Sequence, residues 1–130
     1  MKAFGSLLFF VCFTHFVSFV HAETPQPAYI YRAEVSRIVS GDAVDMNIDL
    51  GFGVWVHGQT LHLRDVKAPD LLGERKEEAL KWKTRLTELL KDRSEIIIQT
   101  TRDKTVKPFR YLAVIWADGE NVNEAMLNAK

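Results

Sequence analysis

The sequence predicts one α+β domain, a small five-stranded β-barrel with helices packed on it. Three observations support this prediction. After the first 22 residues, the chain reads as three strands, a long helix, two strands and a short terminal helix. The strand segments are short, rich in β-branched and aromatic residues, and separated by turn signals. The remaining chain of about 108 residues has the size of one ordinary domain.

Residues 1–22 are predicted to be a secretory signal peptide. Lys2 provides the positive start, and residues 7–20 form an almost unbroken apolar run. Val20-His21-Ala22 fits the small-x-small cleavage pattern, so we expect cleavage after Ala22. A membrane anchor is the alternative, but the apolar run is short for a bilayer span. We therefore expect a secreted or periplasmic protein without stable membrane association after signal cleavage.

The mature chain is expected to be globular, nearly neutral and free of cysteine. The composition is 47% hydrophobic and 26% charged, as is typical of a globular domain. Cys12, the only cysteine, lies in the leader, so no disulfide or thiol chemistry is expected. The leader holds one lysine and no acidic residue, which leaves 16 basic and 17 acidic residues. Non-specific nucleic-acid binders are usually clearly basic, so any polyanion site must be a local patch.

Three strands are expected before the long helix. A flexible lead-in over residues 23–29 precedes a domain at residues 30–130, whose first strands are predicted over residues 29–39, 43–50 and 54–66. The second strand alternates, which predicts four residues on its buried face: Val44, Met46, Ile48 and Leu50. In the third strand, Leu61 and Leu63 share one face, with His62 and Arg64 on the other.

The second half of the chain holds two helices and two further strands. Residues 74–93 are predicted to form the long helix, because apolar residues recur there at helical spacing: Ala79, Trp82, Leu86, Leu89 and Leu90. Strands are predicted over residues 95–101 and 109–117. Asn121 is expected to cap a last helix, with Glu124 three residues on as in a capping box. The OB-fold is the leading small five-stranded barrel, and it often binds oligonucleotides.

Four segments, in the same order along the chain, resemble the staphylococcal-nuclease family. They are residues 39–44 (VSGDAV), 61–70 (LHLRDVKAPD), 103–113 (DKTVKPFRYLA) and 116–125 (WADGENVNEA). The last segment is the most specific, since it is very close to the family's Y-A-D-G-x-x-V-N-E-A pattern. The four segments are spread over residues 39–125 of the predicted domain, so the resemblance implies a staphylococcal-nuclease-like OB barrel.

The resemblance also implies a site, because the family consists of calcium-dependent phosphodiesterases that cut DNA and RNA. It implies Asp42 as a metal-binding carboxylate and Arg110 as an arginine that grips phosphate, and both match the family pattern. Three positions are changed. His62 stands where the family has its first arginine, Lys67 where it has a second metal carboxylate, and Asp70 where it has the glutamate base.

Lys67 argues against calcium at this site. An ammonium group about 4 Å from another unit charge interacts with it by roughly 4 kcal/mol at an effective dielectric constant of 20, so it would repel a divalent cation. Lys67 can instead form an ion pair with Asp42, or with Asp65 if strand alternation brings the two side chains to one face. A neutral His62 also lacks the two-pronged grip of arginine on phosphate.

A basic run gives the best candidate surface for polyanions. It consists of Arg102, Lys104, Lys107 and Arg110, although an ordinary solvated loop explains the run equally well. Pro108-Phe109 replaces the family's Tyr-Gly before the arginine, which stiffens this corner. The tryptophans, Trp55, Trp82 and Trp116, are expected in the core rather than as platforms for base stacking.

These observations predict an exported nuclease-like domain whose metal-dependent activity is weak or lost, with retained binding of single-stranded DNA or RNA through Arg110 and its neighbours. One alternative is an active phosphodiesterase, with calcium held by Asp42 and backbone carbonyls, assisted by Asp45 or Asp65, and with Asp70 as the base. A second alternative is a protein-interaction module on the same barrel. The near-neutral charge favours the interaction module over the active enzyme, and the motifs favour both nucleic-acid interpretations.

Overall fold

Three antiparallel strands make the first half of the barrel. They are β1 (Ile30–Ile38), β2 (Ala43–Asp49) and β3 (Trp55–Leu63), and β2 lies between the other two. The structure is a computed structural model that describes residues 26–106 and 108–128, so the predicted leader and Lys107 lie outside the described residues. Among the described residues, no helix is both long and apolar enough to cross a bilayer.

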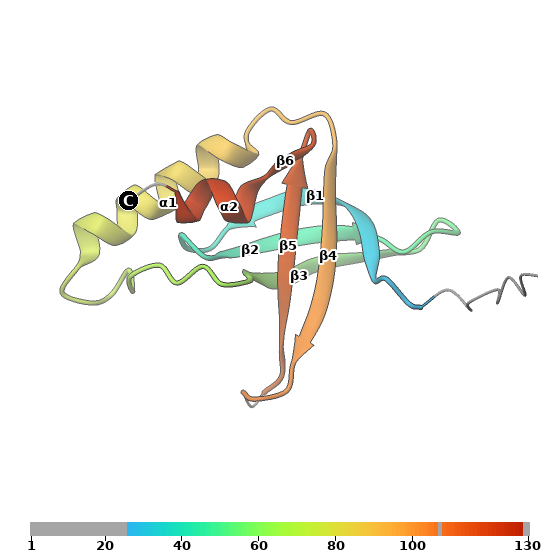
Figure 1. Cartoon of the computed structure of the whole chain (residues 1–130), viewed down its shortest axis with the longest axis horizontal. Coiled ribbons are helices and arrows are strands. Elements are labelled where there is room, and N and C mark those ends of the chain that lie inside the picture. The colour runs from blue at the N-terminus through green and yellow to red at the C-terminus, as the bar shows by residue number, and fades with distance from the viewer. Residues whose placement is uncertain (1–25, 107, 129–130) are drawn as a thin grey trace, which may run out of the picture.

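The barrel closes between β3 and β5. Strand β4 (Ile96–Asp103) pairs antiparallel with β1 and with β5 (Arg110–Ala117), while a short β6 (Glu120–Asn121) pairs with the end of β5. β3 and β5 pair in parallel over residues 61–63 and 111–113, and we call this pairing the β3–β5 seam. The result is a closed, mixed five-stranded barrel with two helices (Figure 1). The predicted α+β barrel is confirmed, and the fold is OB-fold-like.

Both helices pack at the barrel end that holds the β1–β2 turn. α1 (Lys76–Leu90) and α2 (Val122–Leu127) lie together there, away from the β2–β3 turn (Figure 1). The predicted cap of α2 is confirmed, since the Asn121 side chain accepts a hydrogen bond from the Glu124 amide at 3.2 Å. Within the part of the chain that the structure describes, every strand and helix lies between residues 30 and 127.

Inward-facing strand residues and one face of α1 form the core. The largest fully buried side chains are Met46, Leu61, Leu63, Leu86, Ile98, Ile115, Met126, Val44 and Val122. The predicted buried face of β2 is confirmed except for Leu50, which is exposed because β2 ends at Asp49. The expectation that Trp55 lies in the core is wrong. Trp55 is 37% exposed and its ring stacks on His57, with 6.5 Å between the ring centroids.

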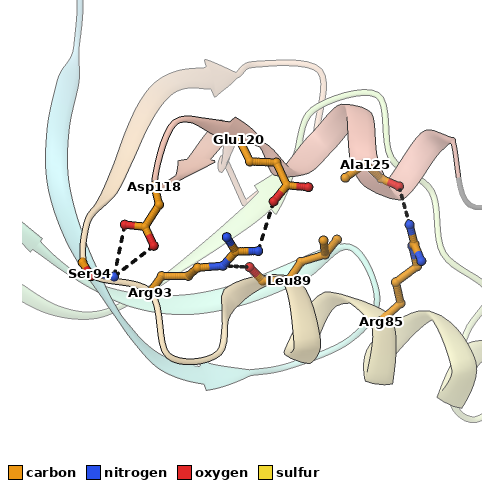
Figure 2. A network of polar contacts seen from close by, with 7 residues as sticks. All are labelled: Arg85, Leu89, Arg93, Ser94, Asp118, Glu120 and Ala125. Atoms are coloured by element: carbon orange, nitrogen blue, oxygen red, sulfur yellow. Dashed lines mark hydrogen bonds and ion pairs between the residues drawn. The ribbon is translucent and has the colours of Figure 1, made fainter.

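Arg93 was predicted to be the last residue of α1, but it lies outside the helix. The helix ends at Leu90, because Lys91 takes an extended conformation. The Arg93 guanidinium then reaches back and donates to the Leu89 carbonyl at 2.8 Å and to the Glu120 carboxylate at 3.0 Å (Figure 2). Arg93 therefore satisfies a carbonyl near the helix end from outside the helix and ties that end to β6.

Two further contacts join the same regions. The Asp118 carboxylate accepts from the Ser94 amide, with 3.1 and 3.2 Å to its two oxygens (Figure 2). Arg85, on α1, donates to the Ala125 carbonyl of α2 at 3.2 Å. The loop before β4, the β5–β6 turn and both helices are thereby held as one unit.

A hydrogen-bonded ion pair crosses β1, β2 and β3 on the outer face of the barrel. Asp45 is only 9% exposed, and one of its oxygens accepts from Arg37 at 3.1 and 2.7 Å. Its other oxygen accepts from the Thr60 hydroxyl at 2.6 Å. The hydrogen bond from Thr60 and then those from Arg37 lower the pKa of Asp45. Asp45 is thus engaged in joining strands and does not line the pocket described below.

We expect this ion pair to make stability depend on acid pH. Because the folded-state pKa of Asp45 lies below its unfolded value, the contribution is complete above about pH 4 and is lost as the pH falls through the folded pKa. Asp45→Asn should lower the free energy of unfolding at neutral pH by only about 1 kcal/mol, because Arg37 is largely solvent-exposed. It should also make the free energy of unfolding depend less on pH in the acid range. Urea unfolding across the acid range measures both effects. Glu88→Gln, at an exposed position of α1, is the control, and an equal acid slope in both variants would contradict the prediction.

Candidate functional site

A pocket of about 430 Å³ gathers residues from three parts of the sequence. Four of the predicted site residues line it: Asp42, His62, Lys67 and Arg110. The β3–β5 seam explains this grouping, because His62 pairs with Leu112, two residues after Arg110. The chain leaving β3 supplies Lys67, and the β1–β2 turn supplies Asp42. We call this cavity the seam pocket.

Asp42 anchors the wall of the seam pocket. Its carboxylate accepts from the Ser40 hydroxyl at 2.7 Å through one oxygen and from the Ala68 amide at 3.2 Å through the other. Its backbone carbonyl accepts from the Leu63 amide at 2.8 Å. Asp42 therefore fixes the β1–β2 turn against the segment that follows β3, a role that the sequence alone did not reveal.

Lys67 is exposed and makes no ion pair with any described residue. The predicted pairing of Lys67 with Asp42 or Asp65 is therefore wrong. Strand alternation does not apply here, because β3 ends at Leu63 and Asp65 has a left-handed backbone with φ of 62°. Lys67 instead leaves its ammonium group beside the pocket without a counter-ion among the described residues.

Arg110 is held by Asp103, which lies opposite it in the β4–β5 register. The Nε atom of Arg110 donates to Asp103 at 2.9 Å, and its two terminal nitrogens make no hydrogen bond to the described residues. Asp103 also accepts from the Thr105 hydroxyl at 2.6 Å and from its amide at 3.0 Å. These two Thr105 bonds, followed by the Arg110 bond, lower the pKa of Asp103 to about 2. Asp103 is thus ionised at neutral pH and positions the guanidinium.

His62 and Asp70 differ in their relation to the pocket. His62 is half-buried, and its ring forms no hydrogen bond to the described residues, so both ring nitrogens remain available. Asp70 lies outside the lining of the seam pocket and borders a neighbouring hollow with Glu74 and Arg75. Its carboxylate accepts from the Leu72 amide at 2.9 Å and so caps a local turn.

The predicted basic run does not form one uniform patch. The Arg102 guanidinium stacks over the Phe109 ring, 4.0 Å from its centroid, on the β4–β5 hairpin. Lys104 is exposed on the same hairpin, and Lys107 lies outside the described residues. Phe109 therefore serves as a platform for Arg102.

The donor set of the seam pocket does not fit calcium. Calcium takes about six to eight oxygen ligands. Both oxygens of Asp42 already accept hydrogen bonds, and Lys67 places an ammonium group in the same pocket. Within residues 26–106 and 108–128, no group of three or more His, Cys, Asp or Glu side chains could hold a metal ion. The other polar side chains of the lining are the carboxylate of Asp65 and the nitrogen-bearing groups of His62, Lys67 and Arg110, and nitrogen donors bind anions.

No protein-family model matches the sequence, and none of the curated proteins matches it. The fold and the site together define a class of protein, an OB-fold-like barrel with a polar pocket beside the seam that closes it.

Proposed function

We propose that this chain is an exported protein of the staphylococcal-nuclease type that binds single-stranded nucleic acid through the seam pocket. In this proposal, calcium-dependent cleavage of phosphodiester bonds is weak or lost. One observation carries the proposal: His62, Lys67 and Arg110 line one pocket, and apart from Nε of Arg110 their side-chain nitrogens have no hydrogen-bond partner among the described residues. Nucleic acid is proposed as the ligand because four sequence segments resemble the nuclease family.

Arg110 is the strongest candidate for a phosphate contact. Its terminal nitrogens are free while Asp103 holds the Nε atom, so two donors remain oriented for an anionic oxygen. Asp103 also lowers the net charge beside the pocket, which limits the affinity for a polyanion. Lys67 adds an unpaired positive charge in the position that the family resemblance gives to a metal carboxylate.

Binding to a short fluorescein-labelled oligothymidylate tests this proposal. Arg110→Ala in the mature chain should weaken binding about 10- to 100-fold, the equivalent of one charge-assisted hydrogen-bonded contact. Asp103→Asn should strengthen binding about two- to fivefold, because it removes an opposing charge beside the solvent-accessible Arg110. The measurement is fluorescence anisotropy at low salt, and added salt should weaken binding by the natural protein.

Arg32→Ala is the matched control. Arg32 is also an exposed arginine in an ion pair, with Glu95 at 3.4 Å, but it lies outside the seam pocket. Equal losses in Arg32→Ala and Arg110→Ala, or no salt-dependent binding at all, would reject nucleic-acid binding at this pocket. Calcium-dependent cutting that a chelator stops would show instead that the natural protein is an active nuclease.

A further inference from the structure

The β2–β3 turn carries a group of exposed apolar side chains. We call them the apolar hairpin tip, and they are Leu50, Phe52, Val54, Trp55 and Val56. Their exposed fractions run from 37% for Trp55 and Val56 to 106% for Phe52. The tip lies at the opposite end of β3 from His62, so it is separate from the seam pocket.

The turn is well defined and presents Phe52 outward. Its three residues, 51–53, all have left-handed backbones, with φ of 82°, 55° and 73°. Such a φ is uncommon for a bulky residue like Phe52. Backbone hydrogen bonds of 2.9 Å close the turn, from the Leu50 amide to the Val54 carbonyl and from the Val54 amide to the Gly51 carbonyl. The exposure of Phe52 therefore belongs to a closed, hydrogen-bonded turn.

The charge pattern indicates what the apolar hairpin tip contacts. Residues 50–63 contain no Asp, Glu, Lys or Arg. The nearest carboxylate, on Asp49, accepts from the Gly51 amide at 2.8 Å. A nucleic acid would require cations at the contact, and the tip has none. Uncharged aliphatic and aromatic side chains instead match the headgroup boundary of a phospholipid bilayer, where Trp and Phe are favoured.

The path of the chain into the barrel gives a second, independent reason to expect a membrane beside the apolar hairpin tip. β1 begins at Ile30, and Arg32 pairs with Asp49, the last residue of β2, so the chain enters the domain beside the tip (Figure 1). Tyr29 and Ile30 are themselves 58% and 53% exposed. The 25 residues before Gln26 include the apolar run of the predicted leader. Until the leader is cleaved, it would hold this end of the barrel next to the membrane.

We infer that the apolar hairpin tip is a membrane-contact surface, which inserts Phe52 and Trp55 reversibly into the interface of a phospholipid bilayer. The contact involves a single turn and no charge pairing, so it is weak and independent of salt. It thereby differs from stable anchoring, and it does not depend on the proposed binding of nucleic acid.

Co-sedimentation with phosphatidylcholine vesicles tests this inference. The mature chain should bind, and Phe52→Ser should lower its partition coefficient roughly 10- to 100-fold, the loss equivalent to burying one Phe side chain. Leu72→Ser is the matched control, because Leu72 is 95% exposed in a different loop, and it should bind as the natural protein does. Phosphatidylglycerol in the vesicles and added salt should leave the binding unchanged.

Tryptophan fluorescence supplies a second measurement. Vesicles should shift the emission of the natural protein to shorter wavelength, and Trp55→Phe should abolish that shift while retaining most of the binding. Three results would overturn the inference: no binding by the natural protein, equal binding by Phe52→Ser, or binding that requires anionic lipid. Self-association that Phe52→Ser removes, without vesicle binding, would also overturn it and assign the tip to a second copy of the chain.

Discussion

Replacing Asn123 with alanine is expected to lower the free energy of unfolding by about 3–4 kcal/mol, because three backbone groups each lose a buried or half-buried hydrogen bond together. Asn123 is 5% exposed. Its side-chain oxygen accepts from the Ile115 amide at 3.0 Å, and its nitrogen donates to the carbonyls of Arg64 at 3.0 Å and Ala113 at 2.9 Å. This side chain joins α2 to β5 and to the segment that leaves β3.

Urea unfolding of the mature chain measures the effect. Asn128→Ala is the control, because Asn128 is exposed at the end of α2, and it should change stability by less than about 0.5 kcal/mol. Asn123→Asp should cost at least as much as Asn123→Ala at neutral pH, since it brings a buried carboxylate oxygen against the carbonyl oxygens of Arg64 and Ala113. A loss below about 1 kcal/mol for Asn123→Ala would mean that water replaces the amide without cost.

Gly41→Ala is expected to lower the free energy of unfolding by about 2–3 kcal/mol, because the β1–β2 turn lies against α1 with no space for a side chain. A Cβ atom at Gly41 would lie 2.5 Å from Cβ of Trp82 and 2.9 Å from Cβ of Ala68. It would also lie 3.1 Å from the backbone carbon of Trp82, so the helix itself would have to move. The displaced turn carries Asp42, so the wall of the seam pocket should shift as well.

Gly73→Ala is the matched control. Its Cβ atom would meet only ordinary contacts at 3.5 Å, so its stability should equal or slightly exceed that of the natural protein. Thermal unfolding compares the two variants, and near-ultraviolet circular dichroism, to which Trp82 contributes, reports the shift of α1. Equal stability of Gly41→Ala and Gly73→Ala would show that α1 adjusts freely to the turn.

The sequence predicted the features of the fold that depend on local patterns. The alternation in β2 identified Val44, Met46 and Ile48 as buried, and the capping residue Asn121 marked the start of α2. These predictions succeeded because periodicity and capping depend on neighbours along the chain.

Trp55 shows where alternation fails. Counted back from the buried Leu61, it falls on the inward face of a regular strand. An irregularity in the β2–β3 register intervenes, however, and Gly58 there has φ of 65°. Val56 consequently pairs with the buried Ile48, and Trp55 lies opposite Asp49. One extra residue in a strand exchanges its two faces, and only the register reveals it.

The residues that line the seam pocket were predictable in part, and their contacts were not. Four predicted residues line the seam pocket, because the strand order of the barrel brings them together. Which carboxylate neutralises which cation depends on the strand register, which the order of residues does not reveal. The pairing of Arg110 with Asp103, rather than of Lys67 with Asp42, follows from the β4–β5 register.

The β3–β5 seam also has a consequence for the order of folding. Its contacts join residues 50 positions apart, such as Leu61 and Tyr111, whereas β2 meets β3 through a short turn. Closing so long a loop costs chain entropy before any contact compensates for it, so local hairpins form first and the seam forms late. His62 and Arg110 lie on opposite sides of that seam. The pocket therefore exists only once the seam has formed, and a chain that has formed its local hairpins without this closure has no seam pocket.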